Sequence, residues 1–170
     1  MTSLVLTVVG DDRAGLVAAV ADVVDTHGGN WEHSQLAELA GAFAGIVEVS
    51  VSPARADALR AALGAIDGLI TIAVLTARSA DDAGPVSHFS FRVLGNDRPG
   101  IVREVTSTLS ARGVSIDRMS TETRDAAMAG GRLFEASIVV SVPSSVDVDE
   151  LTRDLERLAS EIQVDVTRAD

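Results

Sequence analysis

Two six-residue segments combine residue types that could bind a small charged molecule. They are Gly10-Asp11-Asp12-Arg13-Ala14-Gly15 and Gly95-Asn96-Asp97-Arg98-Pro99-Gly100. An apolar helical pattern follows each segment, so the free backbone amides of a helix N-terminus would lie beside an aspartate. Such amides attract a carboxylate, and an aspartate accepts hydrogen bonds from an ammonium group. The segments could therefore recognise a free α-amino acid.

A second interpretation of the same residues involves no ligand. Asp12 and Asp97 stand where a helix N-cap is expected, and Pro99 is expected in the first helical turn. In that case Arg13 and Arg98 would make only surface contacts. Both interpretations remain open at this point.

The two segments belong to a longer internal repeat. Matches at the same offset of 85 residues include Val17 with Val102, Val20 with Val105, and Gly28 with Gly113. We therefore predict a tandem duplication with a first module over residues 1–78 and a second over residues 86–170. Residues 79–85 are small and polar and end in Gly-Pro, which is typical of a linker.

Each half has the same predicted order of elements, which is strand, helix, strand, strand, helix, strand. The expected strands cover residues 4–9, 30–38, 43–52 and 69–77, and then 89–94, 114–123, 132–142 and 163–168. Apolar helical stripes run over residues 16–24, 59–66, 101–109 and 148–162. This order predicts an α+β fold of two ferredoxin-like βαββαβ modules, each an antiparallel sheet with both helices on one face.

The halves differ in the connection between their second and third strands. The second connection is longer by six residues, around residues 125–131. Trp31, at the start of a strand, corresponds to Ile116 in the other half. We interpret Trp31 as a packing residue, with an interface anchor as the alternative.

Composition narrows the classes of function. The chain has 14 basic residues, all arginine, against 25 acidic residues, and its net charge is −11. This charge argues against direct binding of nucleic acid, which needs a basic face. The apolar stretch near the N-terminus is too short to span a membrane. We expect a cytoplasmic protein that can form a homodimer.

Motifs for catalysis, cofactors and metals are missing from the sequence. The absence of cysteine excludes disulfides, zinc thiolates and a cysteine nucleophile. His27, His33 and His88 lack the spacing of a metal site. The sequence also lacks a dinucleotide-binding glycine motif, a P-loop and a nucleophile elbow. We therefore predict no catalytic residue, no cofactor and no metal.

The duplicated pattern resembles a known family. GDDRAGLVAAV and GNDRPGIVREV, followed after one helix by HGGN and RGVS, resemble the ACT domain, a small amino-acid-sensing module of metabolic regulation. The segment NWEHSQLAELAGAFAGIVEVSV and the longer second hairpin resemble the family of glycine cleavage system transcriptional repressors, which are stand-alone tandem ACT proteins. Ala14 departs from the usual proline of the family, which should loosen the first loop.

The resemblance implies an effector site where ACT modules pair, beside this loop and the start of the second strand. The residues that it implies in the second module are Asp97, Arg98, Pro99, Gly100, Ile101 and Ser115. In the first module they are Asp12, Arg13, Gly15, Leu16 and Asn30. It further implies a small amino acid as effector, with glycine or serine favoured, and a protein partner such as a DNA-bound transcriptional activator.

Two alternatives to an amino-acid sensor remain. ACT modules with similar loops precede the catalytic part of formyltetrahydrofolate deformylase, but no residues remain in this chain for such a part. The chain could still be a regulatory subunit of an amino-acid or one-carbon metabolic enzyme. It could also be a constitutive protein-interaction module that binds no ligand.

Overall fold

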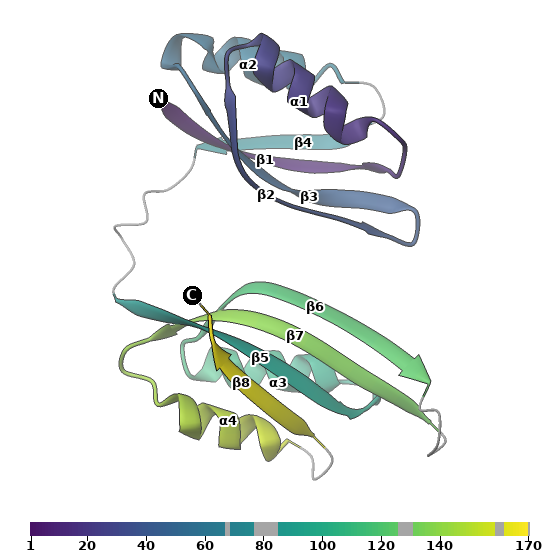
Figure 1. Cartoon of the computed structure of the whole chain (residues 1–170), viewed down its shortest axis with the longest axis vertical. Coiled ribbons are helices and arrows are strands. Elements are labelled where there is room, and N and C mark those ends of the chain that lie inside the picture. The colour runs from purple at the N-terminus through teal and green to yellow at the C-terminus, as the bar shows by residue number, and fades with distance from the viewer. Residues whose placement is uncertain (67–68, 77–84, 126–130, 159–161, 170) are drawn as a thin grey trace. The chain divides into compact units, whose positions relative to one another are not determined.

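The computed structural model describes residues 1–66, 69–76, 85–125, 131–158 and 162–169. The chain divides into two compact units, Met1–Ser79 and Ala80–Asp170, which we call the first and second modules (Figure 1). Residues 79–84 of the predicted linker and residues 126–130 of the longer second hairpin lie outside the described residues.

The first module contains four strands and two helices in the predicted order. They are β1 (Thr2–Asp11), α1 (Leu16–Thr26), β2 (Asn30–Leu39), β3 (Ala42–Val51), α2 (Ala56–Leu63) and β4 (Leu69–Thr76). A short 3-10 turn, Pro53–Arg55, leads into α2. The sheet has the order β2-β3-β1-β4, and each neighbouring pair is antiparallel.

The second module repeats this architecture. Its elements are β5 (Val86–Asn96), α3 (Ile101–Ala111), β6 (Ser115–Asp125), β7 (Arg132–Pro143), α4 (Val148–Glu156) and β8 (Gln163–Arg168). The sheet order β6-β7-β5-β8 matches that of the first module, again with antiparallel pairs. In each module both helices lie on one face of the sheet (Figure 1). The predicted fold class is confirmed.

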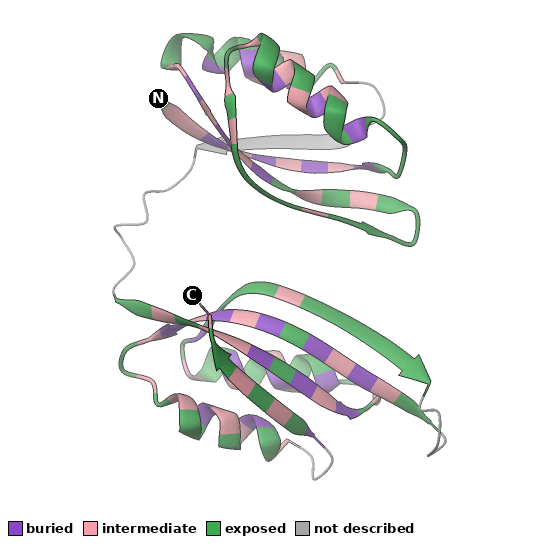
Figure 2. Ribbon diagram, in the orientation of Figure 1, coloured by how far each residue is buried: buried purple, intermediate pink, exposed green. Residues whose placement is uncertain are grey.

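Each module has its own core, built by the alternation of its strands. Leu4, Leu6 and Val8 of β1 are buried between partly exposed neighbours, and Phe91 and Val93 of β5 repeat the pattern (Figure 2). The buried helix residues lie on one stripe per helix: Leu16, Val20 and Val24 on α1, Leu59 and Leu63 on α2, Ile101, Val105 and Leu109 on α3, and Leu151 and Leu155 on α4. One sheet face is thereby covered by helices, and the opposite face is left open.

One predicted helix is too long. The stripe that runs to Ile162 predicts a helix over that length, but α4 ends at Glu156. The backbone tightens there, since the amide of Leu158 bonds the carbonyl of Leu155. Ile162 is buried outside the helix, directly before β8. The apolar period therefore predicted the burial of Ile162 correctly but the length of the helix incorrectly. A buried residue that follows a helix can fall at the spacing of the helix's own apolar residues.

Candidate functional site

The corner between the first strand and first helix has the same backbone in both modules. The N-cap residues are Gly15 and Gly100, in the left-handed region with φ of 87° and 89°. This conformation costs glycine little. The prediction that Asp12 and Asp97 cap these helices is therefore wrong, because the helix begins farther along and no side chain caps it. Pro99 likewise lies before the N-cap and not in the first turn.

The two aspartates lie earlier in the corner loop, and their backbones attach it to the sheet. The amide of Asp12 donates to the carbonyl of Gly41 at 3.0 Å, and the amide of Asp97 donates to that of Arg132 at 2.8 Å. Since Gly41 and Arg132 adjoin the starts of β3 and β7, each loop is fixed to the strand beside it. In the second module the carboxylate of Asp97 also faces Arg132 across an ion pair.

Four of the predicted residues in the second module line one open groove of about 690 Å³. It lies between the corner loop, the start of α3 and strands β6 and β7. The predicted residues are Asp97, Arg98, Gly100 and Ile101, and the others that line the groove are Val102, Arg103, Thr106, Thr121, Thr123 and Phe134. The structure therefore brings the loop together with helix and strand residues that the sequence analysis did not name.

The groove contains both donors and acceptors for a small zwitterion. Among the described residues, the amides of Val102 and Arg103 in the first turn of α3 have no hydrogen-bond acceptor. The carboxylate of Asp97, with its side chain 27% exposed, lies 3.9 Å from the Arg132 guanidinium. Arg132 also donates to the hydroxyl of Thr123 at 2.5 Å. A ligand carboxylate and a ligand ammonium would thus find separate partners here.

Arg98 does not extend its guanidinium toward a ligand. It donates two hydrogen bonds to the Glu104 carboxylate, at 2.9 and 2.5 Å, and a longer one to the carbonyl of Leu158 at 3.4 Å. The bonds from Arg98 lower the pKa of Glu104, and the bonds to Glu104 raise the pKa of Arg98. Arg98 therefore holds the corner loop against its own helix.

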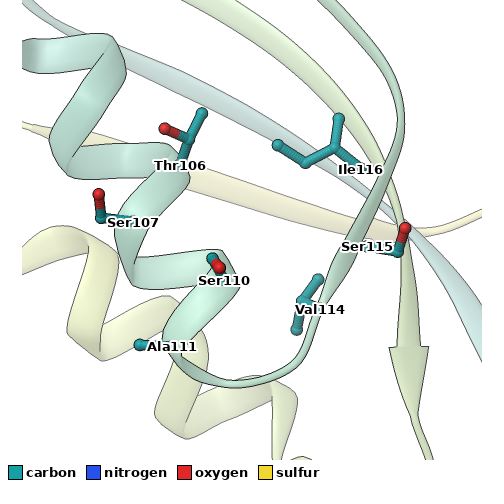
Figure 3. Close-up of a pocket in the computed structure, with 7 residues that line it drawn as sticks. All are labelled: Thr106, Ser107, Ser110, Ala111, Val114, Ser115 and Ile116. Atoms are coloured by element: carbon teal, nitrogen blue, oxygen red, sulfur yellow. The ribbon is translucent and has the colours of Figure 1, made fainter.

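Ser115 lies in a neighbouring groove and not in the corner itself. This second groove, of about 740 Å³, follows α3 to its C-terminal end and is lined by Thr106, Ser107, Ser110, Ala111, Val114, Ser115 and Ile116 (Figure 3). Figure 3 shows Ile116 reaching from β6 toward the helix. Because Thr106 lines both grooves, they adjoin along α3 and β6. Pro99 shapes the loop without lining either.

The first module places its predicted residues differently. Asp12, Arg13 and Gly15 are exposed in the corner loop, whereas the side chain of Leu16 is 3% exposed and belongs to the helix stripe. The side-chain Nδ2 of Asn30 donates to the Glu32 carboxylate at 3.0 Å. Ser50 also donates to Glu32, and these two bonds lower its pKa. The Asn30 side chain is thus already bonded within its own sheet.

A Ser-His-Asp cluster on the second sheet does not have the arrangement of a hydrolase triad. Ser141 and Asp117 each lie 3.2 Å from the same ring nitrogen of His88, Nδ1, and Ser141 donates to Asp117 at 2.7 Å. In a triad the serine and the acid use opposite ring nitrogens. Among the described residues, no three histidine or acidic side chains are grouped to hold a metal. No described helix is long and apolar enough to cross a membrane.

The sequence analysis missed the wall of the first groove opposite the loop. Thr121 and Thr123 lie on β6, opposite Ala136 and Phe134 of β7 in the strand register. Since alternate residues of a strand share a face, the two buried β7 residues indicate that these threonines lie on the helix-covered side. The strand register includes a shift between Ile116 and Arg118, so alternation in the sequence alone could not place these threonines. Trp31 packs against the first core, in agreement with its prediction.

Comparison with known proteins identifies both modules. One model described as an ACT domain matches residues 89–160, and a second such model matches residues 2–66. The chain belongs to the ACT-domain family. Two ACT domains in tandem therefore account for most of the sequence.

Two of the solved structures that resemble this fold cover 99% of the chain. An unknown protein from Galdieria sulphuraria has 29% sequence identity and a TM-score of 0.87, with 99% of each chain covered. A structure named "putative glycine cleavage system transcriptional repressor" has 21% identity and a TM-score of 0.67, and covers 99% of this chain and 98% of its own. Both matches include the two modules of this chain. No curated protein matches the sequence.

Proposed function

We propose that this tandem ACT protein is a non-catalytic regulator that binds a small free amino acid in the groove beside the second corner loop. One observation supports the proposal: Val102 and Arg103, whose backbone amides have no acceptor among the described residues, line the same groove as Asp97. The helix N-terminus suits a ligand carboxylate. Asp97 suits a ligand ammonium, and Thr121 and Thr123 offer hydroxyls to a small polar side chain.

The second module is the better candidate for the effector. Its corner loop is held by the bonds between Arg98 and Glu104, and its groove contains three threonines. In the first module Ala19 occupies the position of Glu104, and Ala14 occupies that of Pro99. We therefore assign the effector to Asp97 and its neighbours, and we assign the first corner a structural role.

In this proposal, binding of the effector changes the affinity of the protein for a partner. An effector that favours the partner-binding state must itself bind more tightly when the partner is present. The name of one structural relative supports a finer proposal, in which the effector is glycine or serine and the partner acts in transcriptional control of glycine cleavage. The acidic charge of the chain is consistent with a regulator that contacts a protein and not DNA.

A thermal-shift scan of the twenty amino acids tests the proposal. At tenfold saturation a ligand stabilises the fold by about 1.4 kcal/mol, which raises the melting temperature by roughly 3–6 °C. Asp97→Asn should remove the shift, whereas the matched variant Asp12→Asn should retain it. If no amino acid stabilises the protein, the sensor is rejected in favour of a constitutive interaction module. Equal loss in both variants would reject the assignment to the second corner.

A further inference from the structure

Arg103 lines the first groove, and nothing described so far uses its side chain. It lies in the first turn of α3, on the same groove as Asp97 and Thr106. The residue is exposed. Among the described residues, its guanidinium forms no hydrogen bond and no ion pair. A cation of the groove is therefore left for a bound molecule.

The guanidinium of Arg103 lies beside the corner loop. A Cβ built on Gly100, the N-cap of α3, would lie 3.7 Å from Nη2 of Arg103. Side chains of a helix lean toward its N-terminus, which accounts for this direction. The bonds from Arg98 lower the pKa of Glu104, and the nearby charge of Arg103 adds to this effect. Arg103 is thus close to the Arg98–Glu104 pair without bonding to it.

The other two charged residues that line this groove already have partners. Arg98 donates to Glu104, and the carboxylate of Asp97 lies 3.9 Å from the guanidinium of Arg132. Within the described part of the chain, Arg103 is the groove residue whose charge has no such partner. Its own backbone amide is one of the two unbonded amides at the start of α3. A carboxylate bound by these amides would therefore lie within reach of the guanidinium.

We propose that the guanidinium of Arg103 binds the carboxylate of the effector and makes the groove specific for compounds that carry one. This inference rests on the proposed function, to which it adds a specificity-determining residue. A guanidinium offers two parallel N–H groups that match the two oxygens of a carboxylate. The ammonium group of the same effector faces Asp97. Each charge of a free amino acid then meets an opposite charge.

The first module lacks this residue. Ala18 occupies the position of Arg103, although the corners of the two modules have the same N-cap conformation at Gly15 and Gly100. An alanine at this position of α1 indicates that the architecture does not need an arginine there. The side chain of Arg103 can therefore be removed to test binding without removing a contact of the core.

Isothermal titration calorimetry on the full chain tests the inference. The probes are the twenty amino acids, and the carboxamide of any that binds serves as the matched compound without a carboxylate. Wild type should prefer the free acid to the carboxamide about tenfold or more. Arg103→Ala should raise the Kd of the acid by a similar factor. Arg103→Lys, which keeps the charge but loses the paired N–H groups, should recover part of the loss.

Arg118→Ala is the matched control, because it removes the same charge outside the groove. Arg118 is exposed on β6, and its register with Val139, between the buried Ile138 and Val140, places it on the open face of the sheet. This variant should bind the amino acid as the wild type does. Circular dichroism and the melting temperature of each unliganded variant check that it is folded, and Arg103→Gln replaces the alanine variant if that does not fold.

The outcomes separate this inference from the proposed function. If an amino acid binds the wild type and a folded Arg103→Ala equally well, the role of Arg103 is overturned and the amino-acid site stands. Equal weakening by Arg118→Ala also overturns the role, because overall charge would then explain the loss. If none of the twenty amino acids binds the wild type, the proposed function fails and this inference with it. Weakening by Arg103→Ala alone, partly restored by lysine, supports the inference.

Discussion

The two modules share one backbone plan but use opposite parts of it. In the first module the corner loop lacks a carboxylate at the position of Glu104, while the open sheet face is apolar around Ile46. In the second module the corner loop is fixed by Arg98 and Glu104, while the open face has an ion-paired network around Glu135. The buried strand and helix positions are apolar in both modules, whereas the open-face positions around Ile46 and Ser137 differ in polarity, so the shared fold constrains the core more strongly than the surface.

The largest expected change in stability comes from a substitution in β3, the third strand of the first module. Gly45 of β3 corresponds to Ala136 of β7, and a Cβ at Gly45 would lie 2.1 Å from the backbone carbonyl oxygen of Gln35. Since backbone cannot move aside as a side chain can, Gly45→Ala should lower the free energy of unfolding by about 1–3 kcal/mol. Urea denaturation of the variant and the wild type measures this difference in the free energy of unfolding.

The reciprocal variant sharpens this comparison. Ala136→Gly removes one methyl group and adds chain freedom, so it should cost about 0.5–1 kcal/mol. A loss for Gly45→Ala no larger than that for Ala136→Gly would show that β2 and β3 adjust more easily than the contact implies.

An intermediate effect is expected at the first hairpin, where Ala40 has a φ of 52° and Gly41 a φ of 83°. Two residues with positive φ match a tight hairpin turn, which favours glycine or asparagine at both positions. Ala40→Gly should relieve the left-handed strain and raise the free energy of unfolding by about 0.5–1 kcal/mol after the entropy cost of glycine. The control Ala42→Gly, in an extended strand, should destabilise. If both substitutions stabilise the protein, or if neither does, backbone strain at Ala40 is not the cause.

The smallest effect tests the loop of the second module through pH. The bonds from Arg98 lower the pKa of Glu104 in the folded protein, so the pair stabilises the fold above the usual carboxyl pKa. That stabilisation is lost as the pH falls through the folded pKa. Glu104→Gln should therefore melt below the wild type at pH 7, and the difference should begin to shrink near the usual carboxyl pKa of about 4.3 and vanish only below the lowered pKa of the folded state.

A double-mutant comparison controls this measurement. Adding Arg98→Gln to Glu104→Gln should cost little more, because the first substitution has already removed the pair. A difference between wild type and Glu104→Gln that does not change with pH would show that packing, and not ionisation, holds the loop.

The sequence predicted the fold well because both modules bury residues with clear periods. The alternation in β5 indicates a strand, and the apolar stripe of α3 indicates a helix. Because both patterns recur at Leu4–Val8 and in α1, the same order of elements could be predicted for the two modules. Helix ends were less predictable. Asp147, which caps α4 by accepting from the amides of Asp149 and Glu150, was identifiable from the acid three residues later. The glycine caps of α1 and α3 could not be identified in this way, because an aspartate earlier in each loop is also a favoured N-cap residue.

Only the part of the candidate site that is contiguous in sequence, the corner loop, could be predicted. The loop of Asp97 to Ile101 came from the repeat, but the opposite wall depends on which strand lies beside α3. That neighbour is β6, which follows the helix in sequence, so Thr121 and Thr123 required a register that begins with a bulge near Ile116. A bulge shifts the face of every later residue and cannot be located from alternation alone.

The clamp between Arg98 and Glu104 has a consequence for affinity. A loop with its backbone bonded to Arg132 and its side chain bonded to α3 has few conformations left to lose when a molecule arrives. Rigid recognition surfaces bind with a smaller entropic penalty than surfaces that order on contact. The small effector that we propose would therefore pay little for ordering this loop, which favours affinity in a ligand with only a handful of non-hydrogen atoms.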